Sequence, residues 1–136
     1  MGKKISKIIC DTGVISRMIS GDEKYIIAEN ELLLNYNIVI TTVTKIELYN
    51  WIYDYKSQLG EKNFNIFLKK INQFEVIKID NKTSDIAEKL AVKCFKSGVG
   101  DLLTAAIGIR FKLKIFTINF KHFKDGIFGF ILIKII

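Results

Sequence analysis

The sequence predicts an α/β protein with a mostly parallel central sheet. Short apolar runs such as 7–10 and 37–41 are typical of buried strands, and they alternate with segments whose apolar residues recur every three or four positions, as in amphipathic helices. The segment 101–117 has both patterns in succession, a helix and then a strand joined by two or three residues. Such a unit is half of a parallel α/β repeat.

The first part of the chain alternates between these two patterns. Residues 7–10 form a strand that ends at Asp11, and the helical spacing that follows stops at Gly21. A second helix covers 22–34, and the run NIVIT at 37–41 gives the second strand. The carboxyl end of the first strand is therefore marked by an acidic residue.

The rest of the chain continues the alternation. Threonines in 41–44 are suited to leaving the second strand and capping a helix, whose apolar pattern begins at Ile46. The same signals then predict a helix at 61–71, a strand at 74–79, a helix that follows a capping cluster at 81–85 and reaches Cys94, a helix opened by Asp101, a strand at 114–117 and a last strand within 127–136.

Length and charge limit the organisation and the partner. A chain of 136 residues that is 49% hydrophobic suits a single domain, 1–136, with one substantial core. The net charge of +7 favours a polyanion such as nucleic acid. All but two of the 21 basic residues are lysines, the exceptions being Arg17 and Arg110. Because lysine is a point charge suited to phosphate, we expect contacts to the nucleic-acid backbone to outweigh reading of bases.

Several classes of protein are disfavoured. Cys10 and Cys94 lie in separate apolar segments without a paired motif, which indicates buried thiols in a reducing compartment and not a redox protein. His122 is the one histidine, so there is neither a zinc-site spacing nor a histidine pair for acid–base catalysis. The first apolar run is too short for a signal peptide and the last too short to cross a membrane. We expect a cytoplasmic protein without membrane contact.

Three acids are expected at one edge of the sheet. Asp11 ends the first strand, Glu47 lies just beyond the second, and Asp101 opens the helix before the fourth, which Asn119 follows. In an open parallel sheet with right-handed crossovers, the loops at the carboxyl ends of the strands form the binding crevice. Each acid also has a purely structural explanation, since Asp101 could cap its helix and Glu47 could complement the helix dipole from the first turn.

A cluster of these acids would need a cation. Two carboxylates about 4 Å apart repel by roughly 4 kcal/mol at an effective dielectric constant near 20. Ligands that are all oxygen select a hard ion, so Mg²⁺ or Mn²⁺ is the expected cofactor. A divalent ion in a basic protein can bind a phosphodiester and lower the pKa of an attacking water. This combination indicates a nuclease.

Four segments also resemble a known family. In this order and spacing, the segments IICDTGVISRMISG, TTVTKIEL, GVGDLLTAAIGIR and FTINFKHF look like the four motif blocks of PIN-domain ribonucleases, especially the VapC-like toxins of toxin–antitoxin pairs. The resemblance extends from Ile8 to Phe123 and implies a PIN-like three-layer α/β/α fold. It also implies a metal-dependent endoribonuclease that cuts tRNA, rRNA or mRNA, pairs with a cognate antitoxin and forms a homodimer.

The resemblance assigns roles to residues. Catalytic, metal-binding acids are Asp11, Glu47 and Asp101, and a fourth ligand position, acidic in many members, is Asn119, whose neutral amide is a weaker ligand. Polar residues beside the acids are Thr12, Thr44 and Thr117. His122 is either structural or, with Lys121, a contact to the substrate. Trp51, Tyr53 and Tyr55 offer a surface for the homodimer.

Other functions remain open at this stage. A housekeeping nuclease that processes rRNA or tRNA would have the same residues, and a non-catalytic RNA-binding module could have kept the fold. A phosphoacceptor receiver domain also places acids at strand ends, but it needs an acid pair at the first strand, and Cys10-Asp11 supplies one acid.

Overall fold

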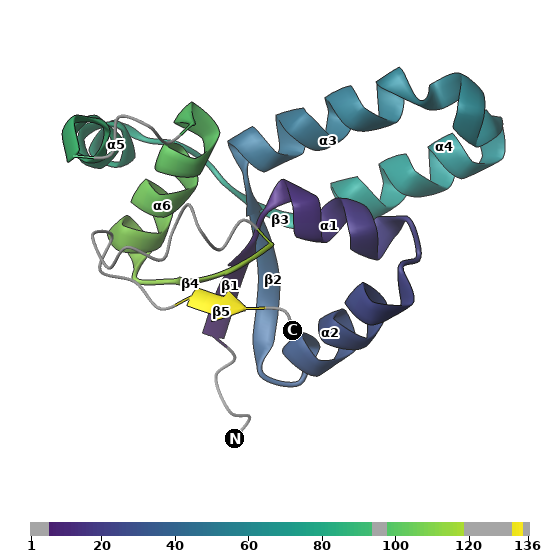
Figure 1. Ribbon diagram of the computed structural model, residues 1–136, viewed down its shortest axis with the longest axis horizontal. Coiled ribbons are helices and arrows are strands. Elements are labelled where there is room, and N and C mark those ends of the chain that lie inside the picture. The colour runs from purple at the N-terminus through teal and green to yellow at the C-terminus, as the bar shows by residue number, and fades with distance from the viewer. Residues whose placement is uncertain (1–5, 94–97, 119–131, 135–136) are drawn as a thin grey trace.

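The computed structural model describes residues 6–93, 98–118 and 132–134 and places in them strands and helices in the expected alternating order (Figure 1). The elements are β1 (Ser6–Cys10), α1 (Thr12–Ile19), α2 (Glu23–Leu33), β2 (Tyr36–Thr41), α3 (Thr42–Asp54), α4 (Lys56–Asn72), β3 (Glu75–Ile77), α5 (Asn81–Lys93), α6 (Val99–Phe111), β4 (Lys114–Thr117) and β5 (Leu132–Lys134).

The described strands form one parallel sheet in the order β3-β2-β1-β4-β5. The central strand β1 pairs on one side with β2, where Ile9 lies opposite Val39, and on the other with β4, where Cys10 lies opposite Phe116. Ile8, Ile9 and Cys10 are fully buried because helices cover both faces of β1. The prediction of an α/β protein with a mostly parallel sheet is confirmed.

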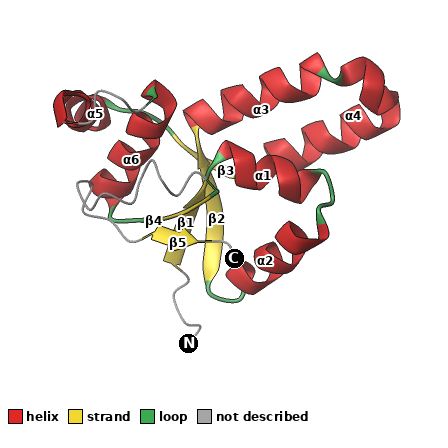
Figure 2. Ribbon diagram, viewed as in Figure 1, coloured by secondary structure: helices red, strands yellow, loops and turns green. Residues whose placement is uncertain are grey.

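The helices form two layers, one on each face of the sheet (Figure 2). Helices α5 and α6 pack on one face, where Leu90, Leu102 and Ile107 meet Ile9, Val39 and Ile115 of the strands. Helices α1 to α4 cover the other face, around Ile8, Ile40 and Phe116. The structure therefore has the three-layer α/β/α architecture that the family resemblance implied.

Small residues bring α6 close to the sheet. Ala105, Ala106 and Gly108 are buried, and a Cβ atom on Gly108 would lie 3.1 Å from Cδ1 of Ile115 and 3.3 Å from the carbonyl oxygen of Leu113. A larger side chain there would push α6 away from β4. This close packing fixes the position of the whole helix, including its first turn, where Asp101 lies.

Two helices begin earlier than the sequence pattern suggested, and both differences affect the acids. The side chain of Thr41 caps α3 by accepting from the backbone N–H of Thr44 at 3.2 Å, so Glu47 lies in the second turn and not in the first. Gly98 is the N-cap of α6, so Asp101 is the third residue of that helix and does not cap it. The two structural explanations for these acids, dipole complementation and N-capping, are therefore wrong as first stated.

Other boundaries differ in smaller ways. Helix α4 begins at Lys56, before the predicted 61–71, and bends at Gly60, whose φ of 79° is accessible to glycine without strain. Strand β3 is shorter than predicted, and β5 falls within the predicted last strand. Cys94, Asn119, Lys121 and His122 lie outside the described residues. In the described part of the chain, no helix is both long and apolar enough to cross a membrane.

We expect Ile107→Ala to destabilise the protein by about 2–5 kcal/mol, because it removes a fully buried side chain from the interface between α6 and the sheet. The matched control is Ile27→Ala on α2, where the side chain is 54% exposed and the loss should stay within about 0.5 kcal/mol. Urea unfolding followed by circular dichroism measures both values. Equal losses in the two variants would contradict this description of the core.

Candidate functional site

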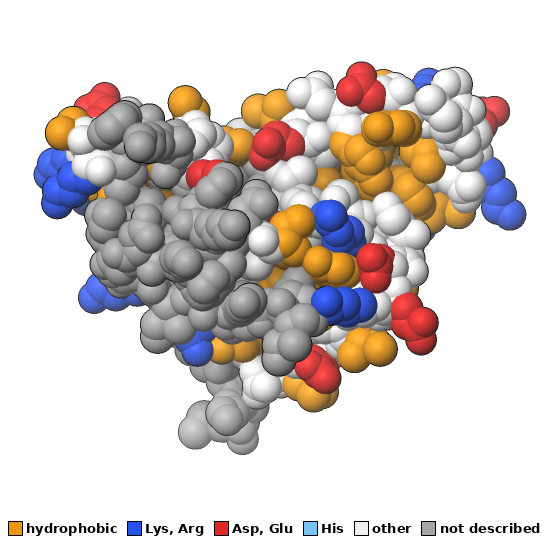
Figure 3. All heavy atoms as spheres, viewed as in Figure 1, with side chains coloured by type: hydrophobic (Ala, Val, Ile, Leu, Met, Phe, Trp, Pro, Cys, Tyr) orange, Lys and Arg blue, Asp and Glu red, His pale blue; other side chains and the backbone are white. Residues whose placement is uncertain are grey.

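A pocket of about 260 Å³ opens where β1 and β2 end and α6 begins. Its described lining consists of acids, threonines and glycines, namely Asp11, Thr12, Gly13, Thr44, Glu47, Gly98, Gly100, Asp101 and Thr104. The fold thus brings together Asp11, Glu47 and Asp101, which are distant in sequence. Figure 3 shows acidic side chains on both sides of the notch between α6 and the near end of α3. We call this lining the acidic pocket.

Asp11 is the most buried of the three acids, with 7% of its surface exposed. It follows β1 directly and caps α1, because its Oδ1 accepts from the backbone N–H of Val14 at 3.1 Å. Its Oδ2 accepts from the hydroxyl of Thr117 at the end of β4. Both oxygens are therefore oriented by neighbouring strands and the helix start. The Asp11 side chain therefore stabilises the local fold and also lines the pocket.

The environment opposes the charge of Asp11. Burial raises the pKa of its carboxyl group above the ordinary value, and the negative charges of Asp101 and Glu47 raise it further. The hydrogen bonds from Thr117 and Val14 act in the opposite direction, because they stabilise the ionised form. The net effect is a raised pKa for Asp11. The surrounding protein therefore does not fully offset the negative charge of the ionised Asp11 carboxylate.

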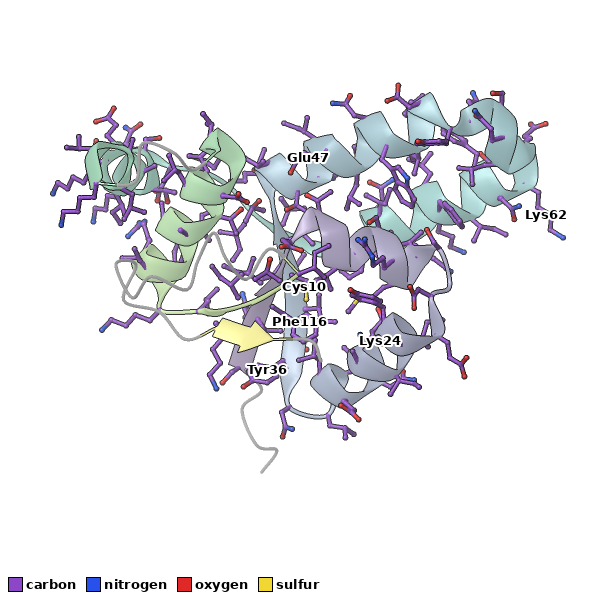
Figure 4. The ribbon with its side chains drawn as sticks, in the orientation of Figure 1. Cys10, Lys24, Tyr36, Glu47, Lys62 and Phe116 are labelled. Atoms are coloured by element: carbon purple, nitrogen blue, oxygen red, sulfur yellow. The ribbon has the colours of Figure 1, made fainter. Side chains whose placement is uncertain are left out.

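Glu47 reaches the pocket from α3 and is held by α1. The hydroxyl of Thr12 donates to its Oε1 at 2.7 Å, and the same hydroxyl lies 3.4 Å from that of Thr44. Figure 4 labels Glu47 on the end of α3 that approaches α1 and α6, with Cys10 of β1 below it. The predicted polar residues Thr12, Thr44 and Thr117 all lie beside the acids.

Asp101 enters the pocket from the first turn of α6. Gly100 lets that turn approach α3, because a Cβ atom there would lie 3.3 Å from Cγ1 of Val43. Thr104, one turn later on the same helix, is 4% exposed and donates from its hydroxyl to the carbonyl of Gly100 at 2.9 Å. Sequence reasoning missed Thr104, although its spacing of three from Asp101 places it on the same helix face.

The chemistry of the pocket suits a hard dication, but its arrangement is more open than expected. Carboxylate and hydroxyl oxygens are the ligands that Mg²⁺ and Mn²⁺ prefer. Yet no group of three His, Cys, Asp or Glu side chains within 6–93, 98–118 and 132–134 is arranged so that it could hold a metal ion. Glu47 is engaged with Thr12, and Asn119 lies outside these ranges. The tight cluster assumed from the sequence is therefore not formed by these side-chain positions.

Several solved structures have the same fold as this chain. They include VapBC2 from Rickettsia felis bound to a DNA fragment from its promoter, with 23% identity over 93% of this chain and 97% of that chain and a TM-score of 0.78. DNA-bound VapBC from Salmonella typhimurium has 20% identity, coverage of 97% and 100%, and a TM-score of 0.77. VapBC-1 from nontypeable Haemophilus influenzae has 22% identity, coverage of 93% and 96%, and a TM-score of 0.73.

The family itself is established by sequence. No curated protein matches the chain. The sequence model of the PIN domain, however, matches residues 8–125, which include the three acids and all the motif segments that suggested the resemblance. The expectation drawn from those segments is confirmed, and the chain belongs to the PIN domain family.

Proposed function

We propose that this protein is a Mg²⁺- or Mn²⁺-dependent endoribonuclease and the toxin of a toxin–antitoxin pair. The observation that carries the proposal is the meeting of Asp11, Glu47 and Asp101 in one pocket of a basic PIN-domain chain. Ionised acids gathered in this way favour a cation, as the raised pKa of Asp11 indicates. The net charge of +7 favours an RNA substrate over a neutral one.

Each residue has a distinct task in this proposal. Asp11 and Asp101 bind the ion directly, and Glu47 and Asn119 complete the site. An ion held by these residues would offset the carboxylate charges and would supply a Lewis acid for the phosphodiester and the attacking water. Thr117 and the Val14 N–H orient Asp11, and Thr12 orients Glu47. Gly98 and Gly100 line the pocket without contributing a side chain to it.

The proposal that this protein is a toxin rests on the solved structures that share its fold. Solved structures that share it include a toxin–antitoxin complex from Klebsiella pneumoniae as well as the VapBC proteins described above. We therefore propose a small antitoxin as partner. The exposed rings of Tyr53 and Tyr55 on α3 and at its end provide apolar surface for a homodimer, which stays a prediction.

A non-catalytic RNA-binding module is the second candidate. It is favoured by one observation, namely that the described acids do not form a ready metal site. A housekeeping nuclease for rRNA or tRNA would share the metal chemistry and differ in its effect on cells. The experiments below separate these functions.

We expect Asp101→Asn to reduce cleavage of RNA in Mn²⁺ by at least about a hundredfold, because it removes a charged ligand of the ion without changing the shape of the pocket. Asp85→Asn on the exposed side of α5 is the matched control and should cleave at the parent rate. The assay follows a labelled RNA by gel electrophoresis. If Asp101→Asn cleaves as fast as its parent, Asp101 has no role in catalysis.

Asp11→Asn should raise the melting temperature near neutral pH when no divalent ion is present. The pKa of Asp11 is raised in the folded protein, so its contribution to stability is full below the ordinary carboxyl pKa and is lost as pH rises through the raised value. Asparagine retains an acceptor for Val14 and carries no charge. The difference from the parent should therefore vanish below about pH 4.

Addition of Mn²⁺ tests whether Asp11 binds the ion. Binding of the ion to the folded protein should raise the melting temperature of the parent and change that of Asp11→Asn much less. A parent that does not respond to Mn²⁺ while still binding RNA would favour the non-catalytic module.

Expression of the protein in a bacterial host should arrest growth, because an unrestrained ribonuclease depletes cellular RNA. Expression of Asp101→Asn should not. Growth at the normal rate with the active protein, together with cleavage of purified RNA, would favour the housekeeping nuclease over the toxin.

A further inference from the structure

The described lining of the acidic pocket includes no lysine or arginine. A dication cannot neutralise three ionised carboxylates, and every phosphodiester of RNA adds a further negative charge. Positive side chains near the pocket would therefore favour binding of RNA at this place.

Arg17 of α1 contacts the backbone of a residue that lines the pocket. Although it belongs to the last turn of the helix, its side chain folds back by one turn, and Nη1 donates to the carbonyl of Gly13 at 3.0 Å. Gly13 itself lines the pocket. A Cβ atom on Gly13 would lie 2.6 Å from Cδ1 of Ile118, so the absence of a side chain there is explained by the packing of Ile118, while Nη1 of Arg17 would lie at an ordinary contact distance of 3.5 Å. The guanidinium of Arg17 is thus joined by one hydrogen bond to a residue of the pocket lining.

The guanidinium is held in place without being neutralised. Its Cζ lies 5.6 Å from the centre of the Tyr25 ring, a distance that allows a cation–π interaction. In the part of the chain that the structure describes, ion pairs join Lys7 to Glu75 and Arg110 to Asp80, and Arg17 takes part in neither.

Arg110 and Arg17 differ in how many of their N–H donors are already used. The guanidinium of Arg110 is committed, because Nε and Nη2 both donate to the carboxylate of Asp80, whose pKa is lowered chiefly by that contact. A guanidinium has five N–H donors in a fixed fork, which matches the oxygens of a phosphate. Arg17 is exposed and donates to one backbone carbonyl, so most of its fork faces solvent.

The usual structural explanation for Arg17 does not account for its position. A basic residue in the last turn of a helix stabilises the helix when its charge lies near the final carbonyl groups. Here the charge lies at the carbonyl of Gly13, in the first turn. The side chain therefore bonds one turn back along α1 and rests on Tyr25 of α2, so its charge is not committed to the final carbonyl groups of the helix.

We propose that Arg17 is a substrate-binding residue whose guanidinium binds the RNA phosphodiester next to the one that is cut. Tyr25 positions this guanidinium. The inference rests on the proposed ribonuclease function and adds a specific contact to it. It assigns no step of the reaction to Arg17. The expected consequence of its loss is weaker binding of RNA with an almost unchanged chemical step.

The test compares Arg17→Gln with Lys24→Gln, which removes the same charge from an exposed position on α2 (Figure 4). The probe is a fluorescent single-stranded RNA oligonucleotide. Its binding is measured in Ca²⁺ and its cleavage in Mn²⁺. Arg17→Gln should raise both Kd and KM by about tenfold, with kcat within about twofold, and should reduce the slope of log Kd against log salt by about 0.7. Lys24→Gln should leave all four values unchanged.

Two further variants separate the contact from general effects of charge. Arg17→Lys keeps the charge and loses the fork, so it should retain the salt slope and lose part of the affinity. Tyr25→Leu should weaken binding by a smaller factor than Arg17→Gln, since it removes the ring that holds the guanidinium. Equal melting temperatures of Arg17→Gln and its parent show that the effects are not due to unfolding.

Three results would overturn the inference. One is equal Kd and KM for Arg17→Gln and Lys24→Gln, and another is a parent protein that does not bind the RNA. The third is a variant that binds RNA normally but loses affinity for the protein encoded beside it, which would assign Arg17 to a carboxylate of that partner. Absence of cleavage by the parent, with RNA binding that still depends on Arg17, would contradict the ribonuclease proposal alone.

Discussion

The buried carboxylate of Asp11 is the feature on which the arrangement of the acidic pocket depends. Its carboxylate is buried at the end of the central strand, and both of its oxygens accept hydrogen bonds, from Val14 and Thr117. Those bonds fix the side chain where the strands end, while burial and two neighbouring acids raise its pKa. The fold thus holds a negative charge in a place that disfavours it. A proton or a cation would therefore stabilise this arrangement.

The architecture delivers the other acids to the same place. Parallel strands joined by helices bring all their carboxyl ends to one edge, so Glu47, reached through β2, and Asp101, at the start of α6, meet Asp11 there. Gly100 allows α6 to begin close to α3, and Gly108 allows the other end of α6 to pack closely on β4. In the proposed arrangement, Arg17 adds a positive charge beside the pocket, whose described lining has no lysine or arginine.

Most of the fold was predictable because its signals are local. The apolar runs of β1 and β2 and the helical spacing of α1, α2 and α6 are visible in the sequence, and the alternation of strand and helix implies the parallel sheet. Helix starts were less predictable. The sequence indicated a capping threonine within 41–44 but not that Thr41 itself caps α3, and α6 begins after Gly98, which offers no side chain as a cap. The acids could be assigned from their places at strand ends. Thr104 could have been found from its spacing of three from Asp101. The engagement of Glu47 by Thr12 and the backward fold of Arg17 could not be predicted, because both depend on side-chain directions in three dimensions.

The central claim is that Asp11 and Asp101 together bind a hard dication. The most direct measurement is a crystal structure of the protein grown in Mn²⁺, with anomalous diffraction used to locate the ion. The account predicts one strong peak in the acidic pocket, with carboxylate oxygens of both residues at about 2.0–2.2 Å, the range expected for small hard dications. A pocket without a peak at saturating Mn²⁺, or an ion bound away from both residues, would contradict it.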